Sequence, residues 1–242
     1  MSFGTAFLDA FPFMTHQFQL LLQQTLNHLE MSGVAIGLAW AIACPLGILV
    51  GHWHRGSFIV ISIANVGRAL PTLAVIALLL ALVGIGFTNI VIALTILAIP
   101  PILAHAYVGI DQVDQDVVEA GRGMGMRETD LLLRVEVPLA LPLIFAGLRT
   151  SVVFVIATAP LAALAGGEGL GVIIVNEPSY GLSGVIAATI WVAVLAVGAD
   201  FALGFLQWLV TPNALRRSRL LGTEARLKSE LDRELVAASA GR

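Results

Sequence analysis

The residues from Glu119 to Pro138, EAGRGMGMRETDLLLRVEVP, combine charged side chains and closely spaced glycines within an otherwise apolar chain. They predict a helix, a break at Gly121, Gly123 and Gly125, and a second helix that ends at Pro138. Glycine supplies the positive φ or the close backbone approach that a sharp turn needs. Charged helix–turn–helix structure is not stable in lipid, so it indicates a surface presented to a partner in the cytosol.

Other residues of chemical interest do not form an enzyme pattern. The only lysine is Lys228 and no GxxxxGK[ST] sequence occurs, so the chain has no P-loop for ATP. The Gly-x-Gly-x-Gly run at 121–125 lacks the preceding strand of a dinucleotide loop. Residues 181–184, GLSG, match the nucleophile pattern of an intramembrane serine protease, but no histidine follows His105 to act as its base. We expect no catalytic residue and no cofactor in this chain.

His52 and His54 flank Trp53 at the end of an apolar stretch. A metal site would need further ligands, and the other histidines lie far away in the sequence, so we interpret this triplet as an interfacial anchor. Aromatic residues commonly mark membrane interfaces, and we do not infer a cage for an ammonium ligand from the other tryptophans, Trp40, Trp191 and Trp208.

The amino-acid composition indicates that the chain is a membrane protein. Of 242 residues, 58% are hydrophobic and 12% are charged, whereas soluble domains are about 25% charged. The single cysteine, Cys44, excludes an internal disulfide. A span needs about 20 apolar residues, and five stretches qualify: 31–51, 58–82, 86–108, 139–162 and 184–210. We therefore predict an all-α polytopic membrane protein.

The distribution of basic residues predicts its orientation. Loops 1–30, 83–85 and 163–183 contain no lysine or arginine, whereas the loops after the first, third and fifth spans do. Basic residues favour the cytosolic side. The N-terminus is therefore expected outside, with a loop at 109–138 and a tail at 211–242 in the cytosol.

Two external segments have predicted structure of their own. Residues 15–30 show apolar positions at helical spacing, which fits either an amphipathic helix at the outer interface or a helix extension packed along the bundle. Residues 163–183 are too rich in Gly, Pro and Glu to span, and we expect an external loop with a short re-entrant helix.

Charges and prolines inside spans mark candidate pathway residues. A charge at the centre of a span costs about 2.5–3.5 kcal/mol on insertion scales, so it faces the bundle or reaches the interface. Asp200 has two candidate partners, Arg68 and Arg149. Proline breaks in membrane helices are tolerated where they line a cavity, which adds Pro71 and its neighbour Thr72 to Arg68 as pathway candidates.

The spacing within 119–138 resembles the EAA motif of ABC importer permeases: Glu-Ala-Ala, three residues, Gly, nine residues, then Ile-x-Leu-Pro. The resemblance implies a five-span type I permease core whose cytosolic coupling helix docks on an ATPase subunit. The residues that would carry this role are Glu119, Ala120, Gly121, Gly125, Val135, Val137 and Pro138.

Further segments are similar to the osmoprotectant branch, whose permeases carry glycine betaine, choline or carnitine. They are 67–79, 84–86, 137–151 and 166–171, with Glu168 where relatives often have a small residue. The resemblance implies a bacterial cytoplasmic-membrane subunit and no nucleic-acid partner. Its partners would be ATPase subunits that bind ATP and magnesium, a second permease copy or paralogue, a solute-binding protein outside and membrane lipid.

Two alternatives to an osmoprotectant permease remain open at this point. The first is a permease with the same core for another small solute such as methionine. The second is a channel or intramembrane enzyme that works without an ATPase.

Overall fold

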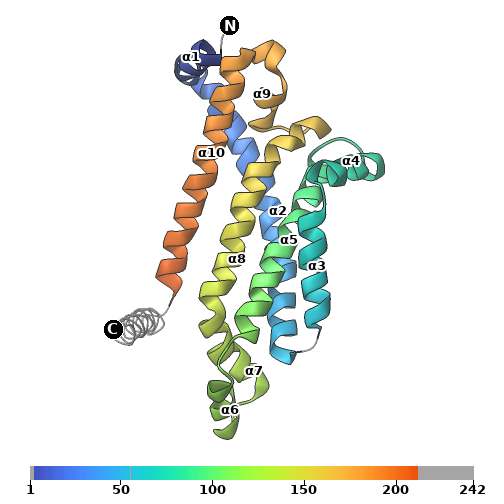
Figure 1. The fold of residues 1–242 in the computed structure, drawn as a ribbon, viewed down its shortest axis with the longest axis vertical. Helices are drawn as coiled ribbons and strands as arrows, with labels where there is room; N and C mark the ends of the chain where they lie inside the picture. Colours follow the sequence, from blue (N-terminus) through green and yellow to red (C-terminus); the bar gives the residue numbers. More distant parts are fainter. Residues whose placement is uncertain (1–2, 55, 212–242) are drawn as a thin grey trace, which may run out of the picture.

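The computed structural model describes residues 3–54 and 56–211, and every element in these ranges is helical. Four helices are long and apolar enough to cross a membrane, and a bent pair makes a fifth span when counted as one. They run side by side along the long axis of the molecule (Figure 1). The long helices are α2 (Phe18–Trp53), α5 (Phe87–Asp111), α8 (Val137–Thr158) and α10 (Glu177–Val210). The predicted all-α polytopic architecture is confirmed, while Arg55 and the tail 212–242 lie outside the described residues.

The core forms where α2 packs closely on α5. Every fourth residue on one face of α2 is small and buried: Ala35, Ala39, Ala43, Gly47 and Gly51. A Cβ added at Gly47 would lie 2.7 Å from the Cβ of Ala106 and from the carbonyl oxygen of Leu103. Small residues at this spacing let two membrane helices approach each other closely, where dispersion contacts and not hydrophobic transfer hold them together.

A charge pair joins the next two helices. Arg149 of α8 donates two hydrogen bonds to the carboxylate of Asp200 on α10. Sequence alone left Arg68 and Arg149 as candidate partners for Asp200, and the structure selects Arg149. Each charge of this bidentate pair has an oppositely charged partner, so neither is presented to lipid as an isolated charge.

The second predicted span, 58–82, is broken at Pro71, one of the prolines that the sequence marked as a candidate break. It consists of α3 (Ser57–Ala69) and α4 (Thr72–Val83), which meet at an angle of 92°. Leu70 is extended, with φ −70° and ψ 120°, because the residue before a proline is driven out of the helical region. Pro71 then precedes α4, which turns away from α3 and packs on the beginning of α5 (Figure 1).

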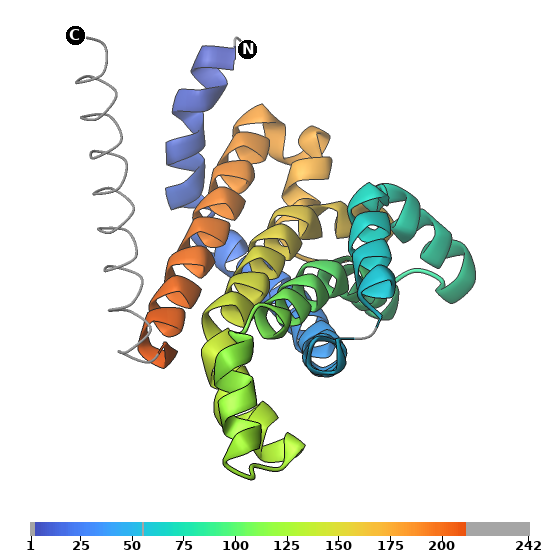
Figure 2. The same ribbon diagram turned by 60° about the horizontal axis from the view of Figure 1, so that its bottom comes forward.

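In the N-terminal region, the structure agrees with the second of the two alternatives for 15–30, a helix extension packed along the bundle. Residues 18–30 are the first turns of α2, with Leu21 and His28 fully buried. An additional helix, α1 (Phe3–His16), precedes them. It packs against the start of α10, as Figure 2 also shows.

The segment after α8 contains two short helices. These are a 3₁₀-helix, η2 (Ala159–Ala165), and α9 (Gly171–Val175), joined by the glycine-rich loop 166–169. The short helix expected within 163–183 corresponds to α9. The loop lies at the end of the bundle opposite α6 (Gln115–Gly123) and α7 (Glu128–Leu131) (Figure 1).

Substituting Gly47 with Leu tests the close packing of α2 on α5. The added side chain would overlap α5, so we expect a loss of about 1–3 kcal/mol in stability and a lower thermal midpoint of the purified protein in detergent. Gly37→Leu is the matched control, because nothing lies within 4 Å of a Cβ at that position of the same helix. Equal midpoints for the two variants would contradict this packing.

Candidate functional site

A helical hairpin, residues 115–136, projects beyond the bundle. It comprises α6 (Gln115–Gly123), α7 (Glu128–Leu131) and a π-helix, η1 (Leu132–Glu136). Figures 1 and 2 show it extending from the ends of α5 and α8. This hairpin holds most of the motif residues that the sequence singled out.

Helix α6 is anchored at its beginning. The Asp114 carboxylate accepts a hydrogen bond from the backbone N–H of Asp116 at 3.0 Å and so caps the helix. Val113 and Val118 are buried against the bundle core. Val117, the residue before Val118, is 44% exposed.

The turn of the hairpin is a Schellman motif. The N–H of Gly125 donates to the carbonyl of Arg122 at 2.9 Å, and that of Met126 donates to Gly121 at 3.2 Å. Gly125 has φ +82°, which matches the positive φ expected from sequence. These bonds satisfy the last carbonyls of α6 and fix the angle at which the chain turns back.

Gly121 permits close approach of the two arms. A Cβ at this position would lie 2.7 Å from Cδ1 of Leu131, which is fully buried on the second arm. Leu132 and Val135 continue this apolar stripe and pack on the bundle core. Glu119 and Ala120 remain exposed on α6. The hairpin therefore has a packed inner face and a polar outer face.

Pro138 does not end the second helix, contrary to prediction. The chain passes from η1 into α8 without interruption, and Pro138 occupies the first turn of α8. The N–H of Val137 donates to the carbonyl of Leu132, five residues earlier. A proline inside regular α-helix removes one bond and crowds the carbonyl four residues earlier, and the wider π-turn accommodates it.

The end of α2 makes polar contacts with the hairpin. Nδ1 of His52 lies 2.7 Å from Oε2 of Glu136, and both side chains are buried. Nε2 of His52 lies 3.5 Å from Oε2 of Glu128. Glu128 accepts two hydrogen bonds from Arg122, at 2.9 and 3.1 Å, and hydrogen bonding to Glu128 is the main cause of the raised pKa of the Arg122 guanidinium.

Sequence reasoning missed this cluster and interpreted His52 only as an interfacial anchor. One feature of the sequence could have indicated this cluster: the acidic Glu136 lies between two valines at the edge of a span. His54 pairs separately with Asp111 at 3.0 Å. Within 3–54 and 56–211, no group of three or more His, Cys, Asp or Glu side chains is arranged to hold a metal ion.

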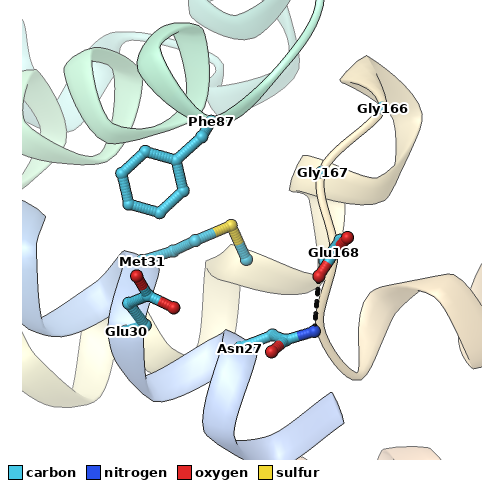
Figure 3. Close-up of a pocket in the computed structure, with 7 residues that line it drawn as sticks. All are labelled: Asn27, Glu30, Met31, Phe87, Gly166, Gly167 and Glu168. Atoms are coloured by element: carbon cyan, nitrogen blue, oxygen red, sulfur yellow. Dashed lines mark hydrogen bonds between the residues drawn. The ribbon is translucent and has the colours of Figure 1, made fainter. Parts of the chain in front are cut away.

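A pocket of about 290 Å³ lies at the opposite end of the bundle (Figure 3). Asn27 of α2 donates a hydrogen bond of 2.5 Å to Oε2 of Glu168. The Gln24 side chain accepts from the N–H of Gly169 at 2.7 Å, which also ties α2 to the glycine-rich loop. Glu30 of α2 and Phe87 at the start of α5 line the same opening.

The three pathway candidates lie around the bend between α3 and α4. Arg68 is in the last turn of α3, and its side chain is outside the described part of the structure. Thr72 begins α4, and Pro71 precedes it. An apolar pocket of about 330 Å³ between α3 and α5 is lined by Gly67 and Leu70, but not by Pro71 or Thr72.

Comparisons with known proteins identify the class of protein that this architecture represents. An apolar helix bundle with a projecting polar hairpin defines a polytopic membrane protein built to contact a partner. Residues 43–210 match the family described as the inner membrane component of binding-protein-dependent transport systems. The chain belongs to this family, which confirms the resemblance to ABC importer permeases.

Curated relatives confirm the osmoprotectant branch. The carnitine transport permease protein OpuCB of Listeria monocytogenes is 40% identical over 82% of this chain and 92% of its own length. The glycine betaine/carnitine/choline permease OpuCB of Bacillus subtilis is 36% identical over 81% and 91%. The osmoprotectant import permease OsmW of Salmonella typhimurium is 33% identical over 86% of this chain and its whole length.

A solved structure shares the fold. The inward-facing MetNI methionine ABC transporter gives a TM-score of 0.71 over 81% of this chain and 98% of that chain, at 21% identity. This likeness confirms the type I permease fold. The chain is thus a multi-pass inner-membrane transport subunit.

Alanine at Gly125 tests the geometry of the hairpin turn. Left-handed backbone costs a non-glycine residue about 1–2 kcal/mol, so Gly125→Ala should open the turn and speed tryptic cleavage after Arg122 and Arg127 roughly 5- to 30-fold. Gly123→Ala is the matched control, since Gly123 has no positive φ and nothing lies within 4 Å of its Cβ. Equal cleavage of both variants in inside-out membrane vesicles would contradict the assigned turn.

Proposed function

We propose that this chain is the permease subunit of an ATP-driven importer for a compatible solute such as glycine betaine, choline or carnitine. The observation that carries the proposal is the rigid hairpin 115–136 on an osmoprotectant-type permease bundle. Its arms are locked by a Schellman turn and by Gly121 against Leu131. A lever of this construction passes on a push from a partner without deforming.

The motif residues divide into three roles in this proposal. Glu119 and Ala120 are exposed and contact the ATPase subunit. Gly121 and Gly125 give the hairpin its shape. The third group lies where the hairpin continues into α8, and it consists of Val135, Val137 and Pro138.

The assembly needs further subunits. This chain has no P-loop, so another chain must bind and hydrolyse ATP. Two ATPase subunits bind ATP with magnesium and hydrolyse the ATP. A second permease copy or a paralogue completes the pathway, and an extracytoplasmic binding protein delivers the solute. The hairpin faces the cytosol and the N-terminus lies outside, in line with the distribution of Arg and Lys. Arg68, Pro71 and Thr72 remain pathway candidates.

Uptake by osmotically stressed cells tests the solute class. Radiolabelled glycine betaine, choline and carnitine are compared in cells with and without this gene, in a background without other systems for these solutes. Loss of uptake on deletion and recovery with the wild-type gene are expected. Normal uptake on deletion, with methionine uptake lost instead, would reassign the solute and leave the permease fold unchanged.

Reversing the charge at Glu119 tests the coupling role. Glu119→Lys should leave the amount of protein in the membrane unchanged and reduce solute uptake at least tenfold, because the exposed carboxylate meets the ATPase subunit. The measurements are uptake and the ATPase activity of the purified complex. Glu177→Lys makes the same charge change on an exposed residue at the opposite end of the bundle. Wild-type uptake with Glu119→Lys would contradict the assignment.

A further inference from the structure

The contact between His52 and Glu136 joins two segments that are 84 residues apart in sequence. His52 is 9% exposed and Glu136 is 3% exposed. Both groups are polar or charged, so their burial is costly unless each satisfies the other. The 2.7 Å contact provides that partner and fixes the position of one side chain relative to the other.

His52 contacts both parts of the second arm of the hairpin. Its Nδ1 faces Glu136 in η1, and its Nε2 faces Glu128 in α7. Glu128 is bound in turn by Arg122 of α6 through a bidentate pair. One imidazole at the end of α2 is therefore connected to all three helical elements of the hairpin.

The opposite end of the same helix is also fixed. Gln24 and Asn27 bind the glycine-rich loop at Gly169 and Glu168. Helix α2 is continuous over 36 residues, which corresponds to about 54 Å at 1.5 Å per residue. One continuous helix therefore connects the hairpin to the Glu168 pocket.

We propose that His52 is a positioning residue that ties the hairpin to α2 through Glu136 and Glu128, so that hairpin movement is passed along α2 to the Glu168 pocket. This inference rests on the proposed function, in which the hairpin is moved by an ATPase. His52 touches neither solute nor nucleotide in this scheme. Its role is to make the hairpin and α2 move as one body.

Three variants separate this role from a contribution to folding alone. His52→Leu leaves the Glu136 carboxylate buried without a partner, and it is expected to lower the yield of folded protein. The double variant His52→Leu/Glu136→Leu removes both polar groups, which is close to neutral for stability, so the protein folds but lacks the directional contact. His52→Gln retains an N–H donor toward Glu136.

A matched control is available two residues away. His54 contacts Asp111, at the end of α5, and neither residue belongs to the hairpin. His54 has φ +50°, a conformation that glycine adopts without strain. His54→Gly therefore removes a histidine–carboxylate contact from the same helix end and leaves the hairpin contacts intact.

The first measurement needs no solute or ATPase. Hydrogen exchange of backbone amides in 128–136 should speed up at least tenfold in the double variant, and remain at the wild-type rate in His52→Gln and His54→Gly. Unchanged exchange in the double variant would overturn the proposal whatever the solute is. Failure of the proposed function would appear differently, as absence of ATPase binding and uptake in the wild type.

The second measurement is the number of solutes imported per ATP hydrolysed by the reconstituted transporter with its ATPase and binding protein. The double variant should bind and stimulate the ATPase normally and fall at least fivefold in this ratio. His52→Gln should retain at least half of the wild-type ratio. A wild-type ratio in the double variant would show that the contact serves folding alone and would overturn the inference.

Discussion

The close approach of α2 and α5 is the constraint on which the other features depend. Lipid tails are as apolar as leucine, so two helices in a membrane gain little by hiding apolar surface and depend on tight packing. Alanine and glycine at every fourth position of α2 provide it, with Gly47 and Gly51 at the hairpin end. This packing holds α2 rigidly, and the positions of His52 and Asn27 follow from it.

Every departure from regular helix is compatible with the same membrane constraint. Unpaired backbone groups are costly in hydrocarbon, so breaks occur where other partners are present. The N–H of Gly86 finds the carbonyl of Ala165, at the end of the bundle. The π-turn at η1 inserts one residue into a helix that rotates about 100° per residue. It thereby changes the face on which Glu136 lies, and in the structure that side chain is buried beside His52.

Sequence predicted the features that depend on local spacing. The motif predicted the hairpin, its turn at Gly125 and the type I permease fold, because these follow from residue types at fixed intervals. The sequence predicted a break at Pro71, because proline bends a helix, but it did not predict that α3 and α4 meet at 92°. The partner of His52 was not predictable, because it lies 84 residues away and depends on how α2, α5 and α8 pack.

In the proposed function, the two faces of the hairpin would make it a lever and not a flexible tether. Its inner face is fixed by buried Leu131 and by the contacts that Glu128 and Glu136 make with His52. Its outer surface exposes Met124 (78%) and Leu133 (66%) among charged residues, a mixture suited to a reversible partner. A partner that moves this outer surface must move the inner contacts too, because each is anchored in a long helix. In the proposed function, force applied at the hairpin would therefore reach α2 and α8 together.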